Sequence, residues 1–442
     1  MSLTPVPAIA RLLHATLLRS TPAANSHLAK PPETVRLVFS EQVVPELSQI
    51  TVVNSNGDSA RLKIANDPHD VHVLIGSEVG TLSGRCKVVW RVLSADGHPV
   101  GGNFTFIIGF DTATATPPPI TTPVGTSAKI PPLSNPAVAP LGTANAPAAS
   151  SDEKPVPIFA SLFRGVGLGA FMTGIGILFF GLSAGERRIL IPGALVTSLI
   201  AVGTLLLVAH SIAWLEHVSP TGHLTADFMS SMLGSAMGRV ELVRVALAVL
   251  TLWAIALARH RKIALWLGVA CIVLSGAVGH PAAIHPYWAI PAKVVHLLSG
   301  SVWLGGLLWL VWVARCDEAA CRIEARRVSS VALIAVIAIF LSGLLQTALF
   351  LNTPSDLFRD DYGRLVLAKI VGLLILVGFG AYNRYSLLPN VESPGTTQRL
   401  ARSVKQEIAI VTIVILIGGF LAYVPTPPLP QSTLQITPGT SP

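Results

Sequence analysis

Eight apolar segments in the second part of the chain restrict its fold more than any other feature. They cover roughly residues 158–182, 189–212, 240–258, 263–280, 288–314, 328–351, 364–384 and 406–424. Each is close to the ~20 residues that an α-helix needs to cross a bilayer. Inside a bilayer, a helix satisfies its backbone hydrogen bonds within one segment. The sequence therefore predicts an all-α polytopic membrane bundle of about eight transmembrane helices over residues 158–425.

The composition agrees with a membrane protein. Of the 442 residues, 51% are hydrophobic and 12% are charged, whereas soluble domains contain about 25% charged residues. A net charge of +8 would be compatible with binding to nucleic acid, but the basic residues form short clusters between apolar segments. Because that pattern sets orientation in a membrane, we predict the lipid bilayer as a partner and no nucleic acid.

The basic clusters follow every second apolar segment. Lysine and arginine come after the first, third, fifth and seventh segments and are scarce in the other connections: Arg187, Arg188, Arg259, Arg261, Lys262, Arg315, Arg322, Arg326, Arg327, Arg384, Arg399, Arg402 and Lys405. Basic loops remain on the cytoplasmic side. We therefore predict that the N-terminal domain and the uncharged tail of residues 426–442 are extracytoplasmic.

The first part of the chain reads as an all-β domain over residues 14–110. Short alternating runs recur between turn residues, at 35–39, 50–53, 71–75, 87–92 and 103–107. Several such strands predict a small sandwich or barrel. Residues 111–157 are rich in Pro, Ala and Thr and have few bulky apolar side chains. Such a segment is typical of a linker.

Export of this domain requires a signal. Residues 1–13 contain no basic n-region, no long apolar run and no small-residue cleavage site before His14, although these features mark a signal peptide. We leave residues 1–13 unassigned and expect either an earlier translation start or a lost signal.

A turn between two predicted strands carries the main candidate site. Asp96 and His98 flank Gly97 there. A carboxylate and an imidazole on a rigid turn suit Cu(II) or Ni(II), although most such pairs are ordinary turn residues. A third ligand is needed, and the candidates within the domain are His14, His27, His69 and His72.

The β domain resembles the CopC family of periplasmic copper-binding proteins. The resemblance is carried by residues 14–15, 20–23, 28, 39–41, 90–92, 94–99, 102 and 104–106. It implies an immunoglobulin-like sandwich that holds Cu(II) through His14 (ring and free amine), Asp96 and His98. The amine becomes a ligand only if processing exposes His14. The domain departs from the family at Cys86, where an aromatic residue is usual, and it has no methionine after Met1, which argues against a thioether site for Cu(I).

The membrane part resembles the CopD family, which is often fused to or encoded beside CopC. The matching residues are 275–276, 279–280, 296–298, 303–307, 362–364, 369, 383–384 and 407, within coverage of roughly 160–425. The combination implies a bacterial inner-membrane protein of copper homeostasis and resistance. Its expected partners are copper ions and periplasmic copper carriers, and no enzymatic activity is expected.

Polar groups in membrane helices are costly and often functional. His280 and His285 are predicted at the outer end of the fourth helix, and His296 about two turns into the fifth. They could relay copper inward, or His296 could simply bond to a neighbouring helix. Met229 and Met232, with Met237, His217 and His223 nearby, lie in an outer connection. Their sulfur atoms could receive Cu(I) or fill an amphipathic interfacial helix.

The remaining polar and small residues of the membrane part are expected to be structural. Trp303-x-Gly305-Gly306 favours close helix packing, and Cys316 and Cys321 are expected to be unliganded thiols rather than a copper exit site. Six charged residues are predicted to be paired or to extend toward the interface: Arg164, Glu241, Arg244, Lys293, Lys369 and Glu407.

Three functions remain open from the sequence. The first is capture of Cu(II) outside the cytoplasm and its transfer into the cell. The sequence contains no P-loop that would supply energy for this transfer. The copper would change valence if the inner acceptors are sulfur atoms. The second is a redox protein, a cupric reductase or electron carrier, in which helix-borne histidines bind haem. A Soret band would support it, and its absence would remove it. The third is a copper buffer or sensor without translocation.

Overall fold

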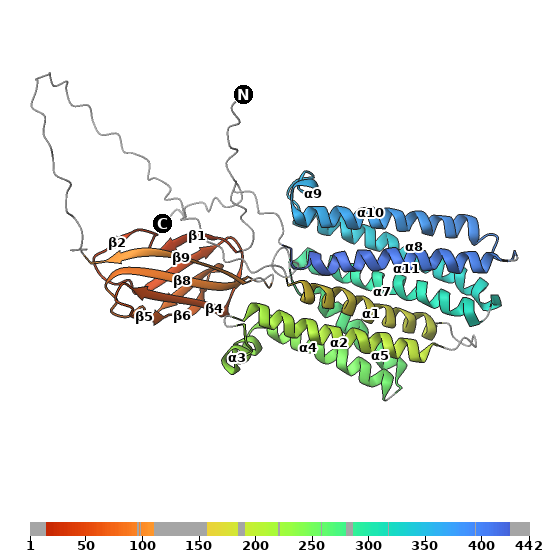
Figure 1. Ribbon diagram of the computed structural model, residues 1–442, viewed down its shortest axis with the longest axis horizontal. Helices are drawn as coiled ribbons and strands as arrows, with labels where there is room; N and C mark the ends of the chain where they lie inside the picture. Colours follow the sequence, from red (N-terminus) through yellow and green to blue (C-terminus); the bar gives the residue numbers. More distant parts are fainter. Residues whose placement is uncertain are drawn as a thin grey trace, which may run out of the picture.

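The computed structural model describes residues 15–94, 97, 99–109, 157–183, 191–219, 222–257, 259–279, 286–316, 318–393 and 395–424. A β domain lies at one end of a long helical bundle (Figure 1). The predicted fold class, an all-β domain followed by an all-α membrane bundle, is confirmed.

The β domain is a sandwich of two sheets around one core. The first sheet has the order β1 (Leu17–Thr21), β3 (Thr34–Phe39), β7 (Asp70–Ser77), β6 (Lys63–Asp67). The second has the order β2 (His27–Leu28), β9 (Pro99–Ile108), β8 (Gly84–Ser94), β4 (Val43–Asn54), β5 (Ser59–Arg61). Alternate residues of β8 point inward, so Cys86, Val88 and Trp90 are buried. The Trp90 ring meets Phe39 of the other sheet edge to face, with ring centroids 5.2 Å apart, and this joins the two sheets.

The helical part begins at α1 and ends at α11. Its long helices are α1 (Ile158–Ser183), α2 (Gly193–Val218), α4 (Ala236–Ala256), α5 (Arg261–Gly276), α7 (Pro286–Cys316), α8 (Glu318–Phe350), α10 (Asp361–Tyr382) and α11 (Thr396–Leu421). Short helices α3 (Ala226–Gly234) and α9 (Asp356–Arg359) lie near the β-domain end, and a π-helical turn (Asn383–Leu387) follows α10. The predicted segments correspond to the eight long helices.

Six of these helices are long and apolar enough to cross a membrane, namely α1, α2, α7, α8, α10 and α11. The other two fall short because α4 carries Arg239, Glu241 and Arg244 and because α5 has only 16 residues. Both nevertheless pack within the bundle, α4 against α2 and α5 against α4 and α7. Two helices start ten residues earlier than predicted, α8 at Glu318 and α11 at Thr396, because hydropathy does not detect the charged opening turns of a helix.

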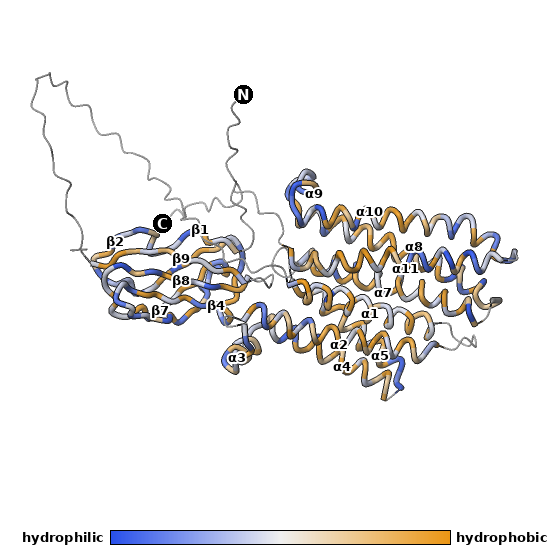
Figure 2. The backbone as a smooth tube through the Cα atoms, viewed as in Figure 1, coloured by the Kyte–Doolittle hydropathy of each residue, from blue (hydrophilic) through white to orange (hydrophobic). Residues whose placement is uncertain are grey.

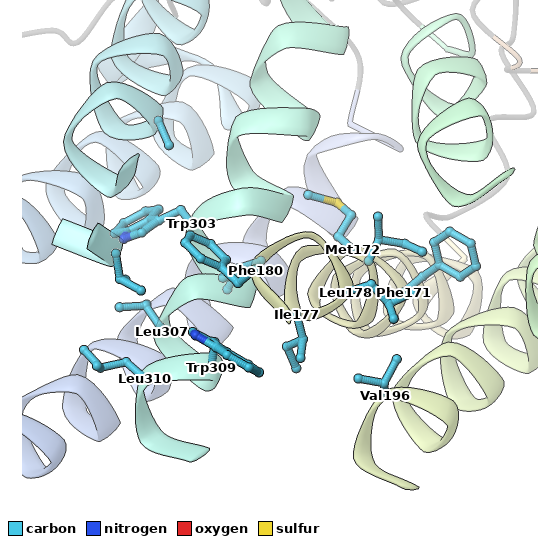
Figure 3. Close-up of a cluster of buried hydrophobic side chains, with 14 of the residues drawn as sticks. Phe171, Met172, Ile177, Leu178, Phe180, Val196, Trp303, Leu307, Trp309 and Leu310 are labelled. Atoms are coloured by element: carbon cyan, nitrogen blue, oxygen red, sulfur yellow. The ribbon is translucent and has the colours of Figure 1, made fainter. Parts of the chain in front are cut away.

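Helix α1 lies at the centre of the bundle, against α2, α7 and α11. Figure 3 shows its side chains Phe171, Ile177 and Phe180 among residues of the neighbouring helices. The backbones of α1 and α7 approach closely at Gly176 and Gly305. A methyl group on Gly305 would collide with the backbone of Gly176, and one on Gly176 would collide with that of Ser301. The predicted packing role of Gly305 agrees with this contact.

Replacement of Gly305 with alanine should therefore push α1 and α7 apart. Overpacking of this kind typically costs about 1–3 kcal/mol, which would appear as a lower Tm of the detergent-solubilised protein. Gly378 of α10 is the matched control, because a methyl group there meets nothing within 4 Å. A G378A variant that loses as much stability as G305A would contradict the close contact.

The β domain and the basic connection between α4 and α5 lie at opposite ends of the bundle. Val218, at the C-terminal end of α2, touches the β domain. At the other end of α2, the Cβ position of Gly193 is 3.9 Å from Arg261 Nη2. Figure 2 shows hydrophilic residues at the ends of the helices and apolar residues between them. The β domain thus lies at the end opposite the basic connection between α4 and α5.

Candidate functional site

The three predicted ligands of the outer site, His14, Asp96 and His98, lie outside the described residues. The structure does describe their neighbours. Ala15 and Ser94 are fully buried. Gly97 has a φ of +94°, in the left-handed region that favours glycine, so the turn between Asp96 and His98 needs glycine at its centre.

The segments that carry these ligands converge on one pair of residues. The Thr16 amide donates to Ser40 Oγ at 2.9 Å, and the Ser40 amide donates to the Thr16 carbonyl at 2.9 Å. Ser94 Oγ donates to Glu41 Oε2 at 2.9 Å. The chain after His14 and the strand before Asp96 are therefore both attached to Ser40 and Glu41.

Glu41 is a carboxylate that sequence reasoning missed as a candidate ligand. It is half-buried and lies where the two ligand-bearing segments meet. Oxygen donors belong to the N,O ligand sets that Cu(II) favours. The sequence offered only its place in the Phe39-Ser40-Glu41 motif, because the contact with Ser94 joins residues 53 positions apart.

The structure separates the other candidate third ligands. His27 pairs with Ile107 near the far end of β9, roughly 30 Å along the strand from Gly97 at ~3.3 Å per residue, so the structure separates His27 from this turn. His72 Nδ1 bonds to Asp70 Oδ1 at 2.9 Å. Although burial opposes it, hydrogen bonding from His72 holds the pKa of Asp70 below its usual value. His69 donates its amide to Asp67 Oδ1 at 2.9 Å.

The turn docks directly onto the membrane bundle. Trp214 Nε1 of α2 donates to the Gly97 carbonyl at 3.3 Å. Arg91 Nη2 of β8 donates to the Val218 carbonyl at 3.2 Å, and burial there lowers the pKa of Arg91. Helix α3 packs on β4 beside these contacts (Figure 1). We call the buried apolar residues of this region the docking cluster: Leu93, Ala160, Trp214, Val218, Phe228, Met232 and Tyr423.

The predicted methionine pair belongs to this region. Met229 and Met232 are three residues apart in α3, which begins after Thr225, whose Oγ1 accepts from the Phe228 amide at 3.3 Å. Met232 is buried in the docking cluster, and Met229 and Met237 pack against it. The Met232 sulfur lies 3.8 Å from Ser235 Oγ. These sulfur atoms are therefore next to the docked β domain.

His210 is a second residue that sequence reasoning missed. It is buried in α2, one helical turn before Trp214. Its Nδ1 lies 3.1 Å from the Ala160 carbonyl of α1 and 3.1 Å from the Tyr423 hydroxyl. The available signal was a histidine followed by serine inside an apolar run.

Of the predicted membrane relay, only His296 is described, because His280 and His285 lie outside the described residues. His296 Nδ1 of α7 lies 3.2 Å from Ser342 Oγ of α8. The Ser342 hydroxyl donates to the Ala338 carbonyl at 2.6 Å, so its oxygen accepts from His296 Nδ1–H. The predicted alternative, a bond to a neighbouring helix, is thus present.

Two of the intramembrane charges form a pair. Arg244 Nε donates to Glu241 Oε2 at 2.9 Å within α4, and Ser211 Oγ of α2 donates to Glu241 Oε1. Both charged residues are buried. Lys293 Nζ donates to the Val278 carbonyl at 2.7 Å, and Asn383 Nδ2 donates to Glu407 Oε1. These contacts agree with structural roles.

None of the four cysteines forms a disulfide. Cys316, at the end of α7, is exposed, whereas Cys321 of α8 is buried. Within the described ranges, no three His, Cys, Asp or Glu side chains converge as a metal site.

Comparison with known proteins follows the same division of the chain. The family described as "CopC domain" matches residues 17–109, and the family described as "Copper resistance protein D" matches residues 323–421. Copper transport protein CutJ of Bacillus subtilis (strain 168) is 26% identical over 444 residues, covering 94% of this chain and 75% of the relative. Inner membrane protein YebZ of Escherichia coli (strain K12) is 28% identical over 247 residues, covering 52% of this chain and 81% of that protein.

The β domain has a further relative of its own. Copper resistance protein C of Escherichia coli is 30% identical over 109 residues, which cover 23% of this chain and 86% of that protein. The matches fall on the sandwich that carries the docked turn and on helices α8 to α11 of the bundle. The chain is therefore a membrane protein that belongs to the CopC family through its β domain and carries a CopD domain at residues 323–421, in helices α8 to α11.

Proposed function

We propose that this chain captures copper outside the cytoplasm with its β domain and passes it into the membrane bundle. The contact between the Gly97 carbonyl and Trp214 Nε1 carries this proposal, because it seats the ligand-bearing turn on the end of α2. Families named for copper resistance at both parts of the chain support copper as the cargo. The proposed function is the binding and transport of copper.

The outer site is proposed to hold Cu(II) through His14, Asp96 and His98. The hydrogen bonds of Thr16 to Ser40 and of Ser94 to Glu41 support it, because they draw the two ligand-bearing segments together. Glu41 adds an oxygen donor at the same place. Imidazole and carboxylate ligands suit the tetragonal preference of Cu(II).

The direction proposed is inward. The basic loops lie at the bundle end away from the β domain, and basic loops are cytoplasmic in membrane proteins. The β domain and the tail of residues 426–442 are then periplasmic, where copper carriers could deliver the ion. Copper is proposed to bind first to Met229 and Met232, beside the docked turn. It then moves inward along three histidines of the membrane part, His280, His285 and His296. Reduction of Cu(II) to Cu(I) at the sulfur atoms takes one electron per ion from an external thiol, so that two thiols form one disulfide and release two protons as two copper ions are reduced.

A substitution of Trp214 directly tests the proposed transfer of copper from the β domain to the membrane bundle. In a Trp214→Phe variant the ring still fills the docking cluster, but the hydrogen bond to the Gly97 carbonyl is lost. Such a bond is typically worth about 1 kcal/mol, so we expect radiocopper uptake into proteoliposomes to fall roughly fivefold while Cu(II) binding persists. Trp266→Phe is the control, because Trp266 is an exposed tryptophan of α5. Equal uptake by the two variants would show that docking plays no part in transfer.

The same assay tests translocation itself. The proposal requires inward copper movement by the parent protein and less by His296→Ala. A parent protein that binds copper and carries none inward would be a buffer or sensor.

A further inference from the structure

Beneath the docked turn lies a histidine that the proposed route does not yet include. His210 and Trp214 are four residues apart in α2 and share one helix face. Helical side chains lean toward the N-terminus of their helix, so the Trp214 ring, which contacts Gly97, leans toward His210. His210 lies eight residues before the end of α2 at Val218, which is a depth of about 12 Å at 1.5 Å per residue.

The hydrogen bonds of His210 determine which nitrogen can bind a ligand. The Ala160 carbonyl, 3.1 Å from Nδ1, can only accept, so Nδ1 carries the proton. The lone pair is then on Nε2, which has no hydrogen bond to any residue that the structure describes. Metal-binding histidines are typically held in this way, with one nitrogen donating to a carbonyl and the other facing the metal.

The surroundings favour a soft ion of single charge. Both partners of His210, Ala160 and Tyr423, belong to the docking cluster, which also contains Met232. Thioether sulfur selects Cu(I) among the forms of copper. The negative charge of Glu241 compensates the positive charge of Arg244. The positive charge of Arg164 also acts on His210. Because Coulomb repulsion scales with ionic charge, a divalent ion would be repelled twice as strongly as a monovalent one.

We propose that His210 Nε2 is the first ligand inside the membrane domain for a soft monovalent cation, Cu(I), directly beneath the docked turn. This inference rests on the proposed function, because the outer site is what brings copper to this position. Occupation forms a bond between Nε2 and the ion and transfers no electron. Tyr423 is a positioning residue, whose hydroxyl lies beside Nδ1 and not beside the ligand nitrogen.

The test uses the full chain in nanodiscs with Ag(I) as a probe that cannot change valence. A His98→Asn background removes the outer imidazole. In that background, His210→Asn keeps an amide donor near the Nδ1 position but lacks Nε2, so the bond to Ala160 can persist. We expect Ag(I) affinity to fall by more than the about 10–100-fold that follows the loss of a residue that merely supports a ligand. His260→Asn is the matched control, because His260 is exposed at the other end of the bundle.

Two further measurements keep the result decisive. X-ray absorption at the silver edge of the His98→Asn protein should show imidazole nitrogen, and its absence would overturn the proposal without any change at His210. Equal Ag(I) binding by the His210→Asn and His260→Asn proteins would overturn it as well. Cu(II) resonance spectra of His210→Asn with His98 intact should match those of the parent. A parent without a bound Cu(II) signal would instead refute the proposed function at the outer site.

Discussion

Replacement of His98 with asparagine should remove the Cu(II) paramagnetic resonance signal of bound copper from the full-length protein. Asparagine preserves the size and polarity of the turn residue but supplies no imidazole. Loss of a residue that merely supports a ligand lowers metal affinity about 10–100-fold, so loss of the imidazole itself should exceed this range. Asp96→Asn should have a similar effect, because Cu(II) would lose its charged oxygen donor.

A Glu41 variant tests whether this carboxylate contributes to Cu(II) affinity. Glu41→Gln preserves a partner for Ser94 Oγ, which donates to Glu41 at 2.9 Å, but removes the negative charge at the junction. We expect a loss of Cu(II) affinity within the 10–100-fold range. His27→Asn, at the far end of β9, is the control and should bind as the parent does. An unchanged signal in His98→Asn would refute the outer site.

Replacement of Glu241 with glutamine should be among the most destabilising single changes in the bundle. Glu241 and Arg244 are buried together and share Ser211. Removal of one member of a buried ion pair typically costs about 3–5 kcal/mol, because the remaining charge has no counterion. The measurement is the free energy of unfolding in mixed micelles titrated with a denaturing detergent.

The matched control is Glu392→Gln. Glu392 and Arg326 are also paired, 3.8 Å apart, but their side chains are 76% and 64% exposed. Exposed pairs contribute about 0–1 kcal/mol, so this variant should unfold almost as the parent does. A Glu241→Met, Arg244→Met double variant should regain most of the stability, since well-packed apolar residues often replace a buried pair without loss. Equal effects of the two glutamine variants would contradict the buried pairing.

The sequence predicts the eight helices well because each leaves a continuous apolar run. It misses the first turns of α8 and α11, where Glu318, Arg399 and Arg402 are charged, because those turns extend beyond the apolar core of the segment. The sequence also predicts α4, because the second half of this helix is apolar. The charged residues near the start of α4 distinguish it from the six helices that are long and apolar enough to cross a membrane.

The docking of the two parts could not be predicted, because no local pattern records which distant surfaces meet. The bond from Trp214 to Gly97 joins residues 117 positions apart. His210 shows the same difficulty, since its partners Ala160 and Tyr423 are 50 and 213 positions away. A single histidine in an apolar run has no neighbours in sequence that distinguish a ligand from a packing residue. Glu41 was likewise inconspicuous until the sandwich brought it to Ser94.

The docked turn has a kinetic consequence. When donor and acceptor belong to one chain, transfer between them is unimolecular and has an effective concentration set by the tether and the contact rather than by the amount of protein. In the proposed transfer, the Gly97 carbonyl is bonded to Trp214, so copper need not be released to bulk solvent between the two sites. The rate of hand-over should then be first order and independent of protein density in the membrane, and a soluble chelator should compete poorly with it.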